Sequence, residues 1–167
     1  MSDTSPDDRP ILVAVDFSAH SAEALKWAAD AAECMDAPLE ILHVVHDPAS
    51  HPGYYRKVDN PGGAERIEDA AERKMHKFLE KVAKKAPDLD LDDARPILVR
   101  GLPVNRILET AEKTGARMIV MGSQGRTGLP HLMMGSKAER VVQLSPIPVT
   151  IVKKPKDRRE PTLDEPE

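Results

Sequence analysis

Aromatic residues and cysteine are scarce in this sequence, and each scarcity narrows the range of functions. Aromatic residues make up 3% of the 167 residues, so a surface on which unpaired bases stack is not expected. The single cysteine, Cys34, excludes an internal disulfide and a thiolate metal cluster. The formal net charge of -4 lacks the positive excess that a phosphate-backbone binder presents. We therefore predict no nucleic-acid partner.

Long hydrophobic runs are also missing from the chain. No apolar stretch approaches the roughly 20 residues that a membrane-spanning helix needs. The first ten residues, MSDTSPDDRP, are acidic and polar, unlike a secretory signal peptide. These features predict a cytoplasmic protein with no membrane insertion.

The chain is long enough for one domain, and its two ends differ in composition from the middle. Residues 1–9 are polar, and residues 154–167, KPKDRREPTLDEPE, are rich in proline and charge. Such segments bury too little apolar surface to fold, so we predict disorder at both ends and a domain over residues 10–153. The charged tail is expected to be solvated, with binding of an unidentified protein partner as the alternative.

Short apolar runs alternate with amphipathic segments throughout this domain, which predicts strands alternating with helices. Five strands are expected at residues 11–18, 38–46, 95–101, 117–122 and 147–153. Helices are expected at residues 21–37, 64–86 and 136–145, and a further one from Pro103 onward. This order predicts a parallel sheet with helices on both faces. In such sheets, ligands bind beyond the carboxyl ends of the strands, where the winding direction reverses.

Two strand ends carry residues suited to binding. The stretch GSQGRTGLPHLMMGS follows the fourth predicted strand, and its glycines at Gly122 and Gly125 would let a ligand approach the backbone. Gly135 and Ser136 open the following helix, whose unpaired N–H groups favour an anion. Two other interpretations stay open: the glycines serve ordinary turns, and Ser136 forms an S-x-x-E capping box with Glu139.

Asp16 ends the first strand, where its carboxylate can accept hydrogen bonds from ribose hydroxyls or hold a metal ion on a phosphate. The alternative is an acid that is stabilised by the dipole of the following helix. The sequence contains neither the phosphate-binding loop G-x-x-x-x-G-K-[ST] nor a glycine fingerprint after the first strand. Their absence disfavours the common NTPase and dehydrogenase mechanisms.

Three segments, ILVAVDFS, ILHVV and MGSQGRTGLPHLMMGSKAERVVQLSPIPVTIVK, resemble the universal stress protein family. The resemblance covers Pro10 to Lys153, and the family pattern G-x2-G-x9-G-[ST], which marks its nucleotide-binding members, is met by Gly122, Gly125, Gly135 and Ser136. It implies an α/β fold of the adenine nucleotide alpha hydrolase-like type, with an open five-stranded parallel sheet in the order 3-2-1-4-5 and helices on both faces. In that order the strands that end in Asp16 and Gly122 are neighbours.

The resemblance also implies an ATP site, with or without Mg²⁺. Asp16 would take the ribose hydroxyls, Val44 would meet the adenine through its backbone, and Ser136 would hold the phosphates. Gln124 and Lys137 stand where the family most often has His and Val, and the Lys137 side chain is expected to point to solvent. The complete implied set is Ala14, Val15, Asp16, Val44, Met121, Gly122, Gln124, Gly125, Gly135, Ser136 and Lys137.

These features predict an ATP-binding regulatory module of the stress-response type rather than an enzyme, because no nucleophile–base pair stands out in the sequence. The alternatives are a slow ATP hydrolase or nucleotidyl-transfer enzyme, and a nucleotide-free dimeric adaptor. The resemblance implies a homodimer formed through the last strand, Pro148 to Lys153, whose apolar edge invites pairing.

Three minor expectations complete the interpretation. Cys34 is expected in or at the edge of the core. His43 and His46 should point to opposite faces of their strand, which makes a metal pair improbable. Valine at both Gly122 and Gly125 is expected to block phosphate approach while leaving the fold largely intact.

Overall fold

The computed structural model describes residues 8–46, 67–125 and 134–155. Within them, strands and helices alternate strictly: β1 (Ile11–Ala14), α1 (Ala19–Cys34), β2 (Leu39–Val45), α2 (Ile67–Lys85), β3 (Arg95–Arg100), α3 (Pro103–Thr114), β4 (Met118–Gly122), α4 (Ser136–Leu144) and β5 (Val149–Val152). Residues 1–7 and 156–167, which make up most of the two segments predicted to be disordered, lie outside the described residues.

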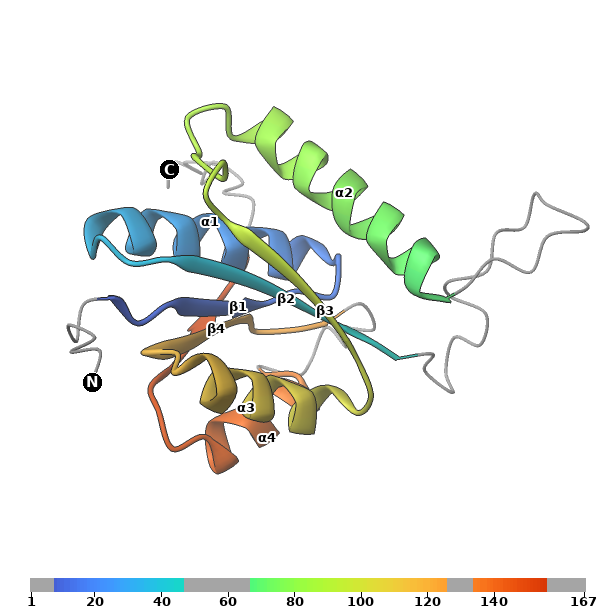
Figure 1. The fold of residues 1–167 in the computed structure, drawn as a ribbon, viewed down its shortest axis with the longest axis vertical. Helices are drawn as coiled ribbons and strands as arrows, with labels where there is room; N and C mark the ends of the chain where they lie inside the picture. The colour runs from blue at the N-terminus through green and yellow to red at the C-terminus, as the bar shows by residue number, and fades with distance from the viewer. Residues whose placement is uncertain (1–7, 47–66, 126–133, 156–167) are drawn as a thin grey trace, which may run out of the picture.

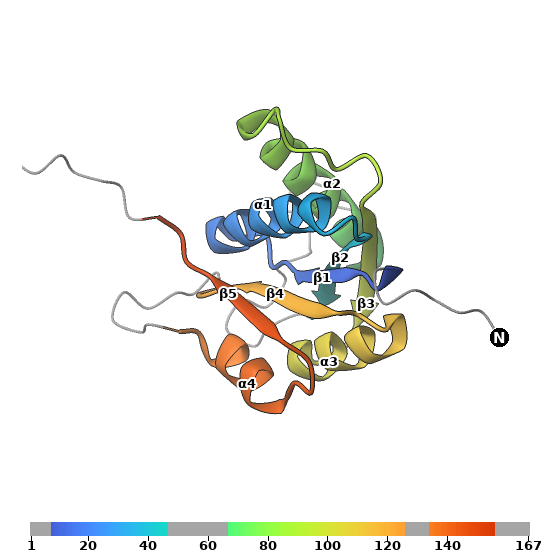
Figure 2. The ribbon, with the colours of Figure 1, turned by 90° about the vertical axis from the view of Figure 1, so that its left-hand side faces the viewer.

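The five strands form one parallel sheet in the order β3-β2-β1-β4-β5, so the predicted fold class is confirmed. Helices α1 and α2 cover one face of the sheet, and α3 and α4 cover the other (Figures 1 and 2). Side chains of β1 alternate between these layers: Ile11 and Val13 pack towards α1 and α2, and Leu12 packs towards α3 and α4. Burial on both faces explains the continuous apolar runs of the sequence.

The central strand β1 pairs with β2 on one side and with β4 on the other. Val13 lies opposite Ile41 in β2 and opposite Val120 in β4. The chain winds outward in opposite directions from β1 and β4, so the switch point lies between their carboxyl ends. The strands that lead into Asp16 and Gly122 are therefore neighbours, as predicted.

The connection from β1 to α1 is tighter than the sequence indicated. The β1 ladder ends at Ala14, and Phe17 then adopts a left-handed backbone conformation with φ 67°. Ser18 is the N-cap of α1, because its side-chain oxygen accepts a hydrogen bond from the Ser21 N–H over 3.1 Å. Helix α1 consequently begins at Ala19, earlier than predicted.

The far end of α1 corrects two expectations. Leu25, Ala28, Ala29 and Ala32 are buried as predicted, but Met35 is the C-cap and is 41% exposed. Cys34 is exposed, so its predicted place in or at the edge of the core is wrong. It lies two positions past Ala32, which places it roughly 200° around the helix from the buried stripe.

No helix in the described parts of the chain is long and apolar enough to cross a membrane.

Candidate functional site

The Asp16 carboxylate lies between the carboxyl ends of β1 and β4. Its Oδ1 accepts a hydrogen bond from the Ser18 N–H over 3.1 Å, at the start of α1. Its Oδ2 faces Gly125, because a Cβ built on that glycine would lie 2.9 Å from the oxygen. One carboxylate oxygen therefore supports the start of α1, and the other lies at the switch point beside Gly125; ribose binding by Asp16 stays a prediction.

Gly122 lies in close contact with the start of α1. A Cβ at this position would lie 2.8 Å from the backbone carbon of His20 and 2.9 Å from its carbonyl oxygen. The missing side chain thus lets the first turn of α1 contact the end of β4. Because backbone atoms cannot move aside cheaply, the expectation that valine at Gly122 leaves the fold intact is wrong.

Gly125 and Gly135 meet at the same end of the sheet. The Gly135 N–H donates to the carbonyl oxygen of Ser123 over 2.7 Å, which joins the start of α4 to the end of β4. A Cβ on Gly135 would make ordinary contacts, at 3.6 Å from the Gln124 Cα and 3.7 Å from the Gly125 nitrogen. Both ends of the predicted phosphate motif therefore converge, while residues 126–133 between them lie outside the described residues.

The first turn of α4 excludes the predicted capping box. Gly135, with φ -72° and ψ 146°, is the N-cap, and Ser136 is already helical. A capping box needs Ser136 itself at the N-cap, and the Glu139 N–H instead bonds the Gly135 carbonyl oxygen over 2.9 Å. Since glycine offers no side-chain cap, the first N–H groups of α4 have no capping side chain at the N-cap position. The Lys137 side chain is exposed, as expected.

Val44 presents its backbone to the crevice beyond the end of β1. The ladder between β1 and β2 ends at Ala14 and Leu42, and the Leu42 carbonyl oxygen accepts from the Val15 N–H over 2.8 Å. In a parallel ladder, alternate residues point their backbone groups to the same neighbouring strand, so those of Val44 face the same side as those of Leu42. The Val44 backbone therefore points to the side of β2 on which β1 lies, and its contact with a ligand stays a prediction.

The remaining apolar site residues belong to two different cores. Ala14, Val44 and Met121 pack with α3 and α4, whereas Val15 packs with α1 and α2. The predicted site at the carboxyl ends of β1 and β4 is therefore bordered by both layers of the fold.

Phe17 and His43 support the site, and the sequence analysis assigned neither to it. Their rings stack with centroids 4.0 Å apart and an angle of 27° between the planes. The His43 Nδ1 lies 2.7 Å from the carbonyl oxygen of Val15, the residue before Asp16. An aromatic residue directly after the strand-ending aspartate, in the run VDFS, was the signal available in the sequence.

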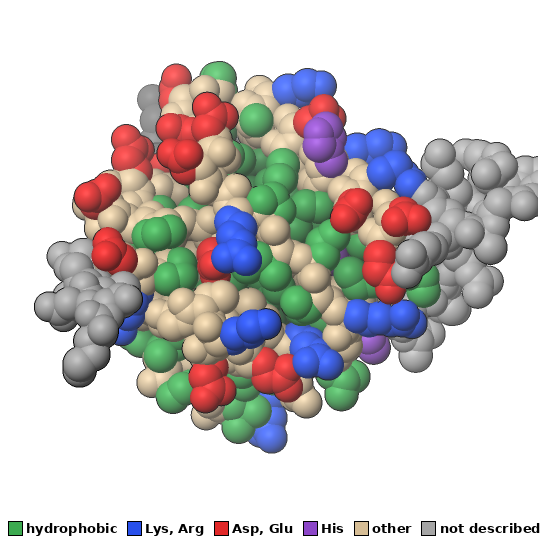
Figure 3. Space-filling view, in the orientation of Figure 1, with side chains coloured by type: hydrophobic (Ala, Val, Ile, Leu, Met, Phe, Trp, Pro, Cys, Tyr) green, Lys and Arg blue, Asp and Glu red, His purple; other side chains and the backbone are tan. Residues whose placement is uncertain are grey.

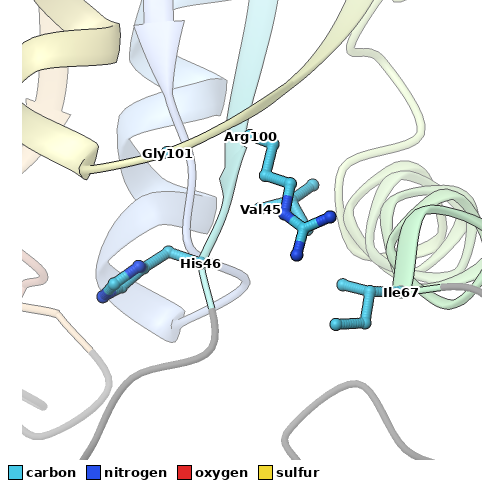
Figure 4. Close-up of a pocket in the computed structure, with 5 residues that line it drawn as sticks. All are labelled: Val45, His46, Ile67, Arg100 and Gly101. Atoms are coloured by element: carbon cyan, nitrogen blue, oxygen red, sulfur yellow. The ribbon is translucent and has the colours of Figure 1, made fainter.

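A hollow lies at the same edge of the sheet, beyond β2 and β3. Its volume is about 260 Å³, and Figure 4 shows the Arg100 guanidinium directed between Val45 and Ile67 while the His46 ring points away from Ile67. Arg100 Nη1 lies 3.4 Å from Glu68 Oε1, and both side chains are exposed. On the face seen in Figure 3, acidic side chains gather at the upper left, and acidic and basic side chains lie side by side on the lower part. Among the described residues, no group of three or more His, Cys, Asp or Glu side chains could hold a metal ion.

Comparison with known proteins shows the family of this chain. The model of the "Universal stress protein family" matches residues 9–153. The chain belongs to the universal stress protein family. A universal stress protein of Methanocaldococcus jannaschii is 36% identical over 148 residues, which cover 89% of this chain and 84% of the relative.

Solved structures of the family share the fold. Protein MJ0577 of the same archaeon has a TM-score of 0.64 and 27% identity, over 89% of this chain and 97% of its own. A universal stress protein of Archaeoglobus fulgidus, solved with dAMP, has a TM-score of 0.58 and 23% identity, over 87% and 98% of the two chains. One solved with cAMP has a TM-score of 0.58 and 22% identity, over 86% and 95%. Structural relatives therefore hold adenine nucleotides.

Proposed function

We propose that this protein binds ATP in the crevice between β1 and β4 and acts as a nucleotide-dependent regulatory module of the stress response. The observation that carries the proposal is the position of the Asp16 Oδ2 beside Gly125, next to the helix start at Gly135. An acceptor for hydroxyl groups and a helix N-terminus without a side-chain cap are thereby brought to one edge of the sheet. A ribose and a phosphate chain need those two kinds of group.

Each part of the nucleotide has a counterpart in the crevice. The adenine would contact the Val44 backbone, with Ala14, Val15 and Met121 beside it. The ribose hydroxyls would donate to Asp16. The phosphates would accept from backbone N–H groups and from the Ser136 hydroxyl at the start of α4, next to Gln124, Gly125, Gly135 and Lys137. Any Mg²⁺ would be held mainly by the phosphates, since the described residues form no metal-binding group of their own.

We further propose that ATP is held without rapid turnover. The hydroxyl of Ser18 and the ring of His43, both near Asp16 in the fold, are engaged in structural hydrogen bonds. A hydrolase of the same fold would instead release phosphate over many turnovers, and this release would disappear in Asp16→Ala. Phosphate release from ATP, followed over hours, separates these functions.

A homodimer through β5 completes the proposal. This strand forms an edge of the sheet, and its four residues are all partly exposed. An apolar edge strand offers unpaired backbone groups to a second copy of the chain. Light scattering at micromolar concentration should give the mass of two chains, and a monomer there contradicts this part of the proposal.

Titration calorimetry with ATP tests the nucleotide site directly. The wild-type protein should bind, and Asp16→Ala should bind at least about tenfold more weakly, equivalent to about 1.4 kcal/mol. Asp30→Ala removes an exposed acid elsewhere on α1 and is the matched control for the change of charge. The proposal fails if the wild-type protein does not bind ATP or if Asp16→Ala binds as tightly as Asp30→Ala. Mass spectrometry of ligand released from the denatured protein gives an independent answer.

A further inference from the structure

His43 is a polar side chain buried within an apolar layer. It is 2% exposed and projects from β2 towards the core that contains Ile41, Val15 and Phe78. A buried polar ring needs a hydrogen bond to offset the loss of water. His43 makes one through Nδ1 to the Val15 carbonyl oxygen at 2.7 Å. Because a carbonyl oxygen only accepts, Nδ1 carries the proton in this contact.

This hydrogen bond fixes the residue that precedes Asp16. The Val15 N–H donates to the Leu42 carbonyl oxygen over 2.8 Å, and the Val15 carbonyl oxygen receives the His43 N–H. Both backbone groups of Val15 are thus tied to β2, one by its backbone and one by a side chain. The orientation of the peptide that leads into Asp16 follows from these two bonds.

The same imidazole also holds the residue that follows Asp16. Phe17 has φ 67°, a backbone conformation that an aromatic residue adopts only when its surroundings hold it there. Its ring stacks on His43 at 4.0 Å and packs against Phe78 at 5.5 Å. The Ser18 N-cap then anchors the chain to α1. Asp16 lies between two residues that both contact His43.

We propose that His43 is a positioning residue, which orients the Asp16 carboxylate towards the ribose hydroxyls of the nucleotide. Its hydrogen bond and its stacked ring hold Val15 and Phe17 in place, and these neighbours direct Oδ2 of Asp16 to Gly125. This inference rests on the proposed function, since it assumes that Asp16 binds a ribose. It adds a role that a merely space-filling core histidine would not have.

The test compares the affinity for ATP with that for 2′,3′-dideoxy-ATP, which lacks the ribose hydroxyls. The ratio of the two dissociation constants isolates the hydroxyl contacts from the rest of the nucleotide. In the wild-type protein this ratio should be about tenfold, and Asp16→Ala should bring it to about one. His43→Phe keeps a ring but loses the donor, so the ratio should fall at least threefold while dideoxy-ATP affinity stays within twofold.

Two further variants keep the test decisive if His43→Phe does not fold. His43→Asn places an amide N–H near the position of Nδ1, so its ratio should stay closer to the wild-type value than that of His43→Phe. Phe17→Leu removes the stacked ring outside β2 and should also lower the ratio. The inference is overturned if the folded variants keep the wild-type ratio, or if they weaken both nucleotides equally. Absence of ATP binding by the wild-type protein would instead reject the proposed function.

Discussion

Oδ2 of Asp16 lies 2.9 Å from the point at which a Cβ of Gly125 would stand. The two residues follow neighbouring strands, β1 and β4, and among the described residues other than Gly125 and its chain neighbours, only Asp16 has an atom within 4 Å of that point. The absence of a side chain at Gly125 therefore leaves room for the Asp16 carboxylate.

Gly125→Ala should weaken nucleotide binding with little effect on the fold. Among the described residues, the added methyl group meets only the end of the Asp16 side chain, which can rotate away and lose its position for the ribose. We expect ATP affinity to fall about tenfold in titration calorimetry. The free energy of unfolding in urea should change by less than about 1 kcal/mol. Unchanged affinity would show that the position of Asp16 does not matter for binding.

Gly122→Ala should have the opposite profile, with a loss of stability. Its methyl group would stand within 2.9 Å of the His20 backbone, so α1 or β4 must shift. Overpacking of this kind costs about 1–3 kcal/mol, which urea denaturation should register as a lower midpoint. Gly125→Ala is the matched control, since its methyl group meets a movable side chain. Equal stability of the two variants would contradict the packing role of Gly122.

Aspartate or asparagine at Gly135 should separate helix stability from anion binding. This residue has the extended backbone of an N-cap, and within the part of the chain that the structure describes, the nearest atoms to an added Cβ lie at 3.6 Å. Gly135→Asn should raise the free energy of unfolding by a few tenths of a kcal/mol, because its side chain caps α4. Gly135→Asp should stabilise α4 as well, yet repel the phosphates.

The two capped variants should therefore differ in ATP affinity. Gly135→Asp should bind ATP more weakly than Gly135→Asn, and the difference should shrink in high salt. Calorimetry at two salt concentrations measures this. Equal ATP affinity of the two variants at low salt would place the phosphates away from the start of α4.

Proline substitutions in β5 should test the proposed dimer, because the two edges of this strand can be blocked separately. The carbonyl oxygens of Pro148 and Val152 accept from β4, so even-numbered residues point their backbone groups inward and odd-numbered ones point outward. Val149→Pro removes an outward N–H, and we expect a folded monomer by light scattering. Thr150→Pro removes an inward N–H and should lower stability instead. A Val149→Pro variant that remains a full dimer would contradict pairing through β5.

The alternation of apolar runs with amphipathic segments was enough to predict every strand and helix that the described residues contain. What the sequence could not decide was which atoms approach a given residue. The spacing of Gly122 is compatible with a phosphate loop, and its close contact with the His20 backbone could not be foreseen from the sequence. The S-x-x-E pattern was misleading by one position, because the chain enters the helix at Gly135 and not at Ser136.

The left-handed conformation of Phe17 is another feature beyond sequence reasoning. No local preference favours an aromatic residue with φ 67°, so the conformation follows from tertiary contacts with His43 and Phe78. Cys34 was misplaced for a related reason. An alanine-rich helix offers few large side chains to mark where its buried stripe ends, and the end at Met35 could not be located from the pattern.

The crevice is bordered by two hydrophobic cores that the sheet keeps apart. The layer under α1 and α2 contains the side chains of Val15, Phe17 and His43. The layer under α3 and α4 contains those of Ala14, Val44 and Met121. A single ligand that contacts residues of both layers would link one layer to the other. Its binding energy would then be added to the cohesion of the whole domain, and amide protons on both sides of the sheet would exchange more slowly when it is present.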